Sequence, residues 1–265
     1  MTSDLIVSVE NRVGYLTLNR PEVRNALSDG IVIGLRDQLT AWERDAGVRA
    51  IVLRGAGDHF QSGGDVKRMG TVAGLAPAER RAQFEQRIHG LHPVMYLMRR
   101  LRKPIVASVQ GAAAGAGMSL MMACDLVIAA DSAFFTLAYI HIGTSPDGGS
   151  TYFLPRTVGM KKAMEIALLG ERFDARTAQQ WGLVNFIVPA AQLADETRKL
   201  AERLAFGPNH ALGNTKLLLN GSLGNTLESQ LQAEGVSFAD CAASADWVEG
   251  VRAFAEKRKP QFKGE

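Results

Sequence analysis

Up to about residue 160, short apolar runs alternate along the chain with longer stretches in which hydrophobic positions recur at helical spacing. The apolar runs predict strands at residues 5–9, 13–18, 50–54, 105–109 and 126–130, and the first two of them form a hairpin. Helical spacing predicts one helix from a cap at Ser28 to about Arg44 and another over residues 78–102. Pro93 should kink or split the second helix, because proline has no backbone N–H to donate. This alternation of strands and helices favours an α/β core.

One stretch, residues 104–124, contains no charged residue and follows a basic segment. Its length alone would allow a membrane span. Pro104 and Gly111, however, divide it into a β-branched run and a run rich in glycine and alanine, and Gln110 lies between them. We therefore interpret the stretch as a buried strand followed by a buried helix.

From about residue 161 the pattern is helical, apart from a strand predicted at residues 184–188. The predicted helices cover residues 161–169, 175–181, 190–206, 210–220, 226–243 and 245–257. Gly207 and Pro208 mark a hinge between two of them. A helical tail that cannot cover its own apolar face packs on the core or on another subunit. We divide the chain into a core, residues 1–200, and a C-terminal helical region, residues 201–265.

Composition adds few constraints. The 265 residues are 46% hydrophobic and 22% charged, which is typical of a globular protein with a substantial core. The formal net charge of +3 gives no reason to expect a nucleic-acid partner. Two cysteines cannot form a disulfide framework, and residues 1–4 lack the pattern of a signal peptide. We expect a cytoplasmic protein without a membrane partner.

Two glycine-rich turns, residues 55–65 and 110–119, follow predicted strands. Glycine lets the backbone approach a ligand closely. A helix that begins in such a turn presents unpaired N–H groups to an anion or a developing oxyanion. The second turn does not match the dinucleotide-binding pattern, and no phosphate-loop motif is present. Taken alone, each turn is more typical of a packing role than of a ligand site.

Asp147 lies in a third turn, residues 143–151, and has two interpretations. Pro-Asp-Gly is a turn signature, so Asp147 is either a cap for a helix that begins near Gly148 or an acid/base carboxylate. The five histidines form no ligand pair at metal-site spacing, so we expect no metal. No Gly-x-Ser-x-Gly motif supports a serine hydrolase.

Together these motifs occur in a familiar order. The chain resembles the enoyl-CoA hydratase/isomerase (crotonase) superfamily over nearly its whole length. The matching stretches are residues 18–27, 60–66, 103–111, 123–129, 154–159, 181–184 and 249–258. The resemblance implies a crotonase-like α/β spiral of β-β-α units with a C-terminal helical region that trimerises. It also implies an acyl-CoA thioester substrate, a homotrimer or dimer of trimers, and no cofactor beyond the CoA of the substrate.

The resemblance places an oxyanion hole at the backbone N–H groups of Gly64 and Ala116. Fixed donors stabilise an enolate without reorganising, and losing one typically costs about 10²–10³ in rate. The CoA contacts that it implies are Val23, Arg24, Ala26, Ser62, Asp65, Val66, Phe254 and Lys257. The last two would approach the CoA of this or a neighbouring subunit. Arg24 and Lys257 are also compatible with solvated surface charges.

The acyl pocket is less well defined by the sequence. We expect it to draw on Met69, Phe84, Met118, Tyr139, Ile142 and Trp181. Residues 70–81 should form part of the pocket and be able to move.

Hydratases of the superfamily use two glutamates, and the corresponding positions here are Ser119 and Tyr139. Neither side chain can act as a carboxylate base at neutral pH. Asp147 lies where several isomerases of the superfamily have an acidic residue. The Ala-rich turn, the Asp147 turn and the C-terminal residues 244–262 most resemble the ring-epoxide/enoyl-CoA isomerases of bacterial phenylacetate breakdown. One carboxylate is sufficient to move a double bond, so we predict an enoyl-CoA isomerase with Asp147 as the proton shuttle.

Three alternatives stay open. The first is a hydratase-type lyase with atypical acid/base residues. The second is an aryl-CoA dehalogenase or hydrolase in which Asp147 is a nucleophile, since His92 and Tyr139 match a histidine and a tryptophan of such enzymes. The favoured interpretation of His92 is, however, a structural place beside the Pro93 kink. The third is a non-catalytic acyl-CoA- or RNA-binding protein, against which Asp147 and the absence of a basic stripe argue.

Overall fold

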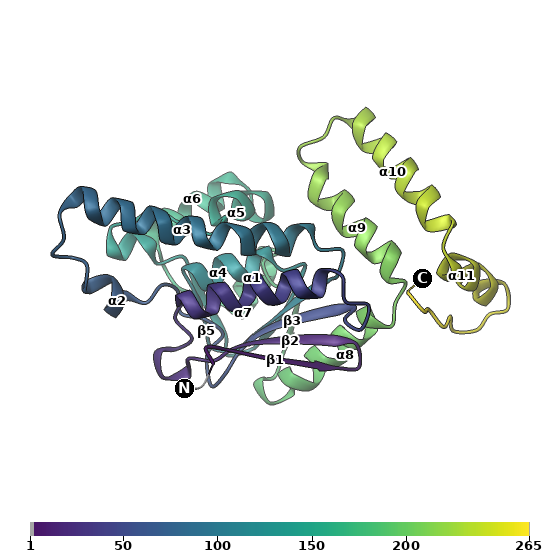
Figure 1. Ribbon diagram of the computed structural model, residues 1–265, viewed down its shortest axis with the longest axis horizontal. Helices are drawn as coiled ribbons and strands as arrows, with labels where there is room; N and C mark the ends of the chain where they lie inside the picture. Colours follow the sequence, from purple (N-terminus) through teal and green to yellow (C-terminus); the bar gives the residue numbers. More distant parts are fainter. Residues whose placement is uncertain (1–2, 265) are drawn as a thin grey trace.

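A six-stranded sheet forms the centre of the computed structural model, which describes residues 3–264 (Figure 1). Residues 1, 2 and 265 lie outside the described residues, and with them part of the N-terminal tetrapeptide and the end of the predicted tail. The strand order is β1-β2-β3-β4-β6-β9, with β1 antiparallel to β2 and every other pair parallel. The strands are β1 Leu5–Glu10, β2 Val13–Leu18, β3 Ala50–Gly55, β4 Ile105–Val109, β6 Leu126–Ala130 and β9 Phe186–Val188.

The predicted strands before residue 131 are confirmed, whereas β9 begins two residues later than expected. The cause is Asn185, which makes one of its two hydrogen bonds to Val127 through its side chain and so does not continue the regular strand ladder. Its side-chain oxygen accepts the Val127 N–H at 2.8 Å, and its own N–H donates to the Val127 carbonyl at 2.9 Å. Pairing with β6 therefore starts only at Phe186.

A second sheet lies beside the first and has the order β5-β7-β8. Its strands are β5 Ala112–Ala114, β7 Phe134–Thr136 and β8 Phe173–Asp174. The chain passes from β4 of the large sheet to β5 of the small one and then into a helix, and it repeats this with β6 and β7. After β3, residue Gln61 makes an isolated parallel bridge to Ala113 of β5. The segment that follows β3 therefore also passes from the large sheet to the small one. These repeated turns form the expected spiral of β-β-α units.

Helices cover both faces of the large sheet. On one face α1 (Asp29–Glu43) and α3 (Pro77–Arg100) lie side by side, and α8 (Leu193–Ala205) covers the other (Figure 1). The Ser28 hydroxyl caps α1 by accepting the Ile31 N–H at 3.1 Å, as predicted. Pro93 does not split α3, which is one helix through that residue.

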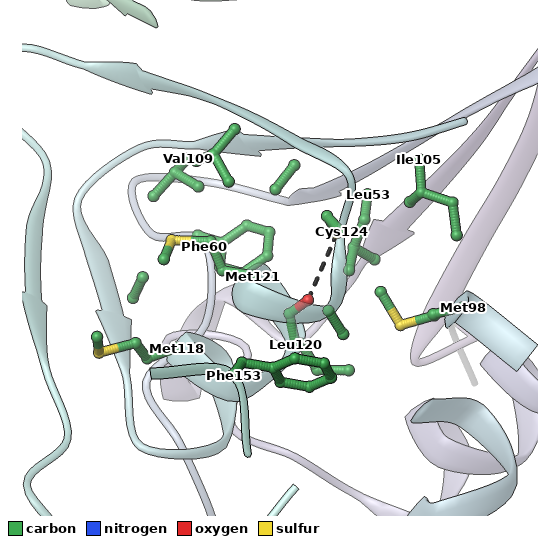
Figure 2. Packing of buried hydrophobic residues seen from close by; sticks show 14 of the residues in the cluster. Leu53, Phe60, Met98, Ile105, Val109, Met118, Leu120, Met121, Cys124 and Phe153 are labelled. Atoms are coloured by element: carbon green, nitrogen blue, oxygen red, sulfur yellow. Dashed lines mark hydrogen bonds between the residues drawn. The ribbon is translucent and has the colours of Figure 1, made fainter. Parts of the chain in front are cut away.

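The uncharged stretch 104–124 is a buried strand and a buried helix, as predicted. It contains β4, β5 and α4 (Ala116–Ala123), and the side chains of α4 pack beneath the sheet (Figure 2). The Cys124 thiol donates to the Leu120 carbonyl at 3.4 Å within this core. Within residues 3–264 no helix combines the length and apolar character needed to cross a membrane.

The remaining helices begin at α2 and continue to the C-terminal region. They are α2 Val66–Gly70, α5 Ser150–Val158, α6 Met160–Leu169, α7 Ala175–Gln180, α9 Asn209–Ser222, α10 Leu227–Ala242 and α11 Ala245–Ala255, with 3-10 turns η1 Pro21–Val23, η2 Tyr139–Ile142 and η3 Ala190–Gln192. The predicted helix 190–206 is thus η3 followed by α8. Helices α9–α11 extend away from the sheets (Figure 1). The boundary at residue 200 falls inside α8 and stays a prediction.

Candidate active site

A cavity of about 1060 Å³ lies where the two glycine-rich turns meet α3 and the segment around η2. Gly64, Ala116 and Asp147 all line it, together with Ser62 and Val66. The fold therefore brings the predicted oxyanion donors and the predicted acid/base residue to the same cavity.

The two glycine-rich turns touch each other at this cavity. Gly63 has φ +101°, Gly115 has φ +49°, and a Cβ atom at Gly115 would lie 3.5 Å from the Cα of Gly63. Ala116 is the first residue of α4, where backbone N–H groups have no partner in the helix. Within residues 3–264, neither the Gly64 nor the Ala116 N–H makes a hydrogen bond. Both donors are thus available to a ligand in the cavity.

Two hydroxyl groups hold the Asp147 turn. The Tyr139 hydroxyl donates to the Asp147 carboxylate at 2.6 Å. The Ser119 hydroxyl donates to the Asp147 carbonyl at 3.0 Å and lies 3.3 Å from the Tyr139 oxygen. Burial, reinforced by the negative charge of Asp147, raises the pKa of Tyr139 well above its ordinary value. Tyr139 is therefore a neutral donor, and both positions that carry glutamates in hydratases here support Asp147.

The interpretation of Asp147 as a helix cap is wrong. The residue before α5 is Gly149, which has a left-handed backbone and makes no side-chain cap. Ser150 bonds instead to the backbone carbonyl of Asp147, with its N–H at 3.1 Å and its hydroxyl at 2.7 Å. The Asp147 carboxylate takes no part in capping, so it stays available to the cavity.

Gly148 fits the Asp147 turn tightly against two helices. Its φ is +58°, and a Cβ atom there would lie 2.9 Å from the Cβ of Ser119 and 3.5 Å from Leu91 of α3. A side chain at this position would push the carboxylate out of place.

The segment around η1, predicted to contact CoA, is fastened to the first glycine-rich turn. The Ser62 N–H donates to the Arg24 carbonyl at 3.0 Å, and the Ser62 hydroxyl donates to the Val23 carbonyl at 3.3 Å. Arg20 bonds to the Ala26 carbonyl at 2.8 Å and pairs with Asp65 at 3.1 Å. Six of the eight predicted CoA residues therefore lie on two joined segments.

The Asp65 carboxylate is engaged within the chain. It caps α2 by accepting the Arg68 N–H at 3.2 Å, and this bond and the guanidinium of Arg20 lower the pKa of Asp65. Arg24 is exposed and has a left-handed φ of 55°. Its role toward CoA stays a prediction.

Phe254 and Lys257 lie in and after α11, at the end of the molecule away from the cavity (Figure 1). Phe254 is 87% exposed and borders a separate hollow of about 380 Å³ among the C-terminal helices. A single chain does not bring these two residues to the site, and their contact with the CoA of a neighbouring subunit stays a prediction.

Most of the predicted acyl pocket lines the cavity. Met69, Phe84, Tyr139 and Ile142 do so, and residues 70–81 contribute Gly70, Val72, Ala73 and Arg80. Met118 and Trp181 were wrong expectations. Met118 is fully buried in the core beneath the sheet (Figure 2), and Trp181 packs against Phe173 with their ring centroids 4.9 Å apart.

The sequence did not single out every residue of the site. His92, which the sequence favoured as a structural residue beside the Pro93 kink, lines the cavity. Arg87 and His141 also line it, and nothing in their local sequence separates them from surface residues. Gln61 is completely buried within the first glycine-rich turn, although its residue type suggests no chemistry.

Comparison with known proteins decides the family. The family model described as enoyl-CoA hydratase/isomerase matches residues 8–265. The chain belongs to the enoyl-CoA hydratase/isomerase family. It is 39% identical over 264 residues to the 1,2-epoxyphenylacetyl-CoA isomerase of Escherichia coli (strain K12), covering 100% of both chains. It is 40% identical over 259 residues to a probable enoyl-CoA hydratase of Rhodobacter capsulatus, covering 97% of this chain and 96% of that one.

Solved structures of this family share the fold. The enoyl-CoA hydratase from Polaromonas sp. JS666 superimposes with a TM-score of 0.92 at 36% identity, over 98% of this chain and 99% of that one. The expected crotonase-like architecture is therefore confirmed, as is the resemblance to the isomerase branch. The protein is an acyl-CoA enzyme of the crotonase superfamily. The names of its relatives include both isomerases and hydratases.

Proposed function

We propose that this family member is an enoyl-CoA isomerase, in which Asp147 moves a proton between two carbons of the acyl chain. The observation that carries the proposal is the set of carboxylates in the cavity wall. Asp29 and Asp147 are the acidic residues of that wall in the part of the chain described, and Asp29 is paired with Arg68 at 2.6 Å. Asp147 instead accepts from a neutral tyrosine, so its charge is not neutralised by a cation.

In the proposed mechanism, the thioester oxygen of a 3-enoyl-CoA binds the N–H groups of Gly64 and Ala116. The Asp147 carboxylate removes a proton from C2, and the electron pair of the broken C–H bond delocalises onto the thioester oxygen. Asp147 then returns the proton to C4, and the double bond moves from C3–C4 to C2–C3. Atoms and charge balance without a co-reactant, so no cofactor is needed beyond the CoA of the substrate.

Ser119 and Tyr139 support this reaction over hydration. Adding water across a double bond requires one group to activate water and another to deliver a proton. Both hydroxyl groups bond to Asp147 instead, and the raised pKa of Tyr139 makes it a poor acid. A carboxylate that accepts one hydroxyl, on a backbone whose carbonyl accepts the other, suits a proton shuttle.

The test is the variant Asp147→Asn, assayed with 3-enoyl-CoA substrates. We expect kcat to fall about 10²–10⁴-fold, the usual contribution of a positioned acid/base group. Asp29→Asn is the matched control, because it removes the other cavity carboxylate, and it should retain activity within a few-fold. Full activity of Asp147→Asn, or an equal loss in the control, would exclude Asp147 as the shuttle.

A second candidate function rests on His92, which lines the same cavity as Asp147. In an aryl-CoA dehalogenase or hydrolase, Asp147 would attack the substrate and form an ester that water then cleaves. Incubation with a halobenzoyl-CoA followed by peptide mass spectrometry distinguishes the two. An aryl adduct on the peptide that contains Asp147 would favour this mechanism, whereas an unmodified peptide with 3-enoyl-CoA turnover supports the isomerase.

A further inference from the structure

Gln61 is a fully buried polar residue within the first glycine-rich turn. Its side-chain amide makes two hydrogen bonds to the backbone of Gly63, two residues later. The amide nitrogen donates to the Gly63 carbonyl at 2.9 Å, and the amide oxygen accepts the Gly63 N–H at 2.7 Å. A backbone N–H only donates and a carbonyl only accepts, so these partners fix the orientation of the amide.

The backbone of Gln61 is bonded to the second glycine-rich turn. Its N–H donates to the Ala112 carbonyl at 2.9 Å, and its carbonyl accepts the Ala114 N–H at 2.9 Å. The turn that begins at Ala114 leads directly to Ala116. Gln61 therefore bonds, through side chain and backbone, to both segments that carry the proposed oxyanion donors.

The first turn of α4 also packs closely against Gln61. A Cβ atom at Gly117 would lie 2.3 Å from the amide oxygen of Gln61 and 2.4 Å from its carbonyl oxygen. This close approach leaves no room for the amide to shift without moving α4. The side chain thus lies between the two donor-bearing turns and limits how far either can move.

We propose that Gln61 is a positioning residue that sets the separation of the Gly64 and Ala116 N–H groups. This inference rests on the oxyanion hole of the proposed function. Donors stabilise a developing oxyanion only when they are held in place before the reaction. A displacement of about 1 Å in a catalytic group can cost roughly 10²-fold in rate.

An apolar residue of the same length cannot replace the amide. The Gly63 carbonyl also accepts the Leu27 N–H at 2.8 Å, but the Gly63 N–H donates to Gln61 alone among its described partners. Without the amide this buried N–H must turn toward another acceptor, because an unsatisfied buried donor is costly. Turning it rotates the adjoining Gly64 peptide and moves the first oxyanion donor.

The test compares Gln61→Met with a matched control, Gln110→Met. Gln110 also follows a strand and bonds two carbonyls through its amide nitrogen, at 2.7 Å to Gly55 and 3.1 Å to Gly57, but it bonds to neither Gly63 nor α4. The probe is butyryl-CoA labelled with ¹³C at the thioester carbonyl. Its infrared C=O frequency on binding reports the strength of the oxyanion hole without turnover.

For Gln61→Met we expect loss of at least half of the wild-type carbonyl shift. In the isomerase assay kcat should fall about 10–10²-fold, while KM and the Kd for butyryl-CoA stay within a few-fold. Gln110→Met should retain both the shift and kcat. Gln61→Glu keeps the volume and can accept the Gly63 N–H but cannot donate to its carbonyl when ionised, so its shift should be intermediate. This second variant keeps the test decisive if Gln61→Met folds poorly.

A full wild-type shift and unchanged kcat in Gln61→Met would overturn the inference while leaving the proposed function intact. A parallel loss of affinity and thermal stability, with an unchanged carbonyl shift, would also overturn it, because that pattern indicates a purely structural role. Absence of any shift in the wild-type protein would instead refute the oxyanion hole itself, and the role of Gln61 with it.

Discussion

At the scale of single residues, the position of Asp147 depends on its neighbours rather than on an ion pair. Gly148 lets the turn approach Ser119 and Leu91, and Tyr139 fixes the carboxylate with a short hydrogen bond. A hydrogen bond to a charged group contributes about 1.5–3 kcal/mol. The orientation of the carboxylate is thus set by uncharged groups rather than by a bound cation.

Tyr139→Phe removes this bond and should lower kcat/KM about ten- to a hundredfold, in line with the energy of a hydrogen bond to a charged group. Since the pKa of Tyr139 is raised, the phenol stays protonated as pH rises, and the wild-type enzyme should keep its activity from pH 7 to about pH 10, the ordinary tyrosine pKa. The check is the pH dependence of kcat/KM for both proteins. An alkaline loss near pH 9 that disappears in Tyr139→Phe would contradict the prediction.

At the scale of elements, a buried ion pair holds α9 against the core. The Lys216 ammonium lies 2.7 Å from Asp125, with side chains 5% and 18% exposed, and it also donates to the Lys103 carbonyl at 3.1 Å. Burial lowers the pKa of Lys216 and raises that of Asp125, so each charge depends on the other. Asp125 in turn accepts the Ile105 N–H of β4 at 2.7 Å.

Lys216→Met leaves the Asp125 charge buried without its partner, so it should lower the free energy of unfolding by about 3 kcal/mol. The double variant Lys216→Met/Asp125→Asn should recover most of that loss, because no buried charge then remains. Lys199→Met is the control, since its 2.7 Å pair with Glu196 lies on the surface. Urea unfolding measures all three, and an equal effect of the two lysine substitutions would show that the buried pair has no special role.

Hydrophobic periodicity predicts the long elements of this fold well and the short ones poorly. The strands of the large sheet and helices such as α1 and α9 follow from their patterns. Strand β5, however, is three alanines, which show no alternation of apolar and polar positions. Helix α2 has five residues, fewer than two helical turns, and its cap at Asp65 was assigned to CoA instead. Such short elements depend on tertiary contacts rather than on the local sequence pattern.

The same limit applies to the site. Gly64, Ala116 and Asp147 stand out because glycine-rich turns and an isolated carboxylate are visible in sequence, and the structure places them in one cavity. The directions of Met118 and Trp181 depend on packing, so their assignment to the pocket failed. Gln61 bonds to its own backbone two residues on, a contact that leaves no sequence pattern.

At the scale of the whole molecule, the C-terminal helices expose a large apolar surface. The exposed side chains of α9–α11 and their connections include Leu219, Leu223, Leu227, Leu231, Val236, Phe238, Val251 and Phe254. So many exposed apolar side chains in one region of the chain indicate an interaction site. We expect it to be covered by other copies of the chain.

Light scattering should therefore give a mass about three or six times the 28.6 kDa of one chain. Phe238→Glu, which puts a charge on a side chain 72% exposed in the single chain, should shift the protein toward the monomer. Lys259→Gln, also in the tail, changes the net charge by the same −1 and is a control for the charge change alone. A monomeric wild-type protein would contradict the predicted trimer.

The two proposed oxyanion donors belong to the backbone, whereas the proton is moved by a side chain. No exchange of one amino acid for another, apart from proline, deletes a backbone N–H, but any exchange at position 119, 139 or 147 alters the acid/base residue or a hydroxyl that holds it. Oxyanion stabilisation and proton transfer therefore differ in how they respond to mutation. Substitutions in such a scaffold can change the proton-transfer chemistry while keeping the groups that stabilise the enolate. Laboratory evolution toward new thioester chemistry should therefore begin at those three positions.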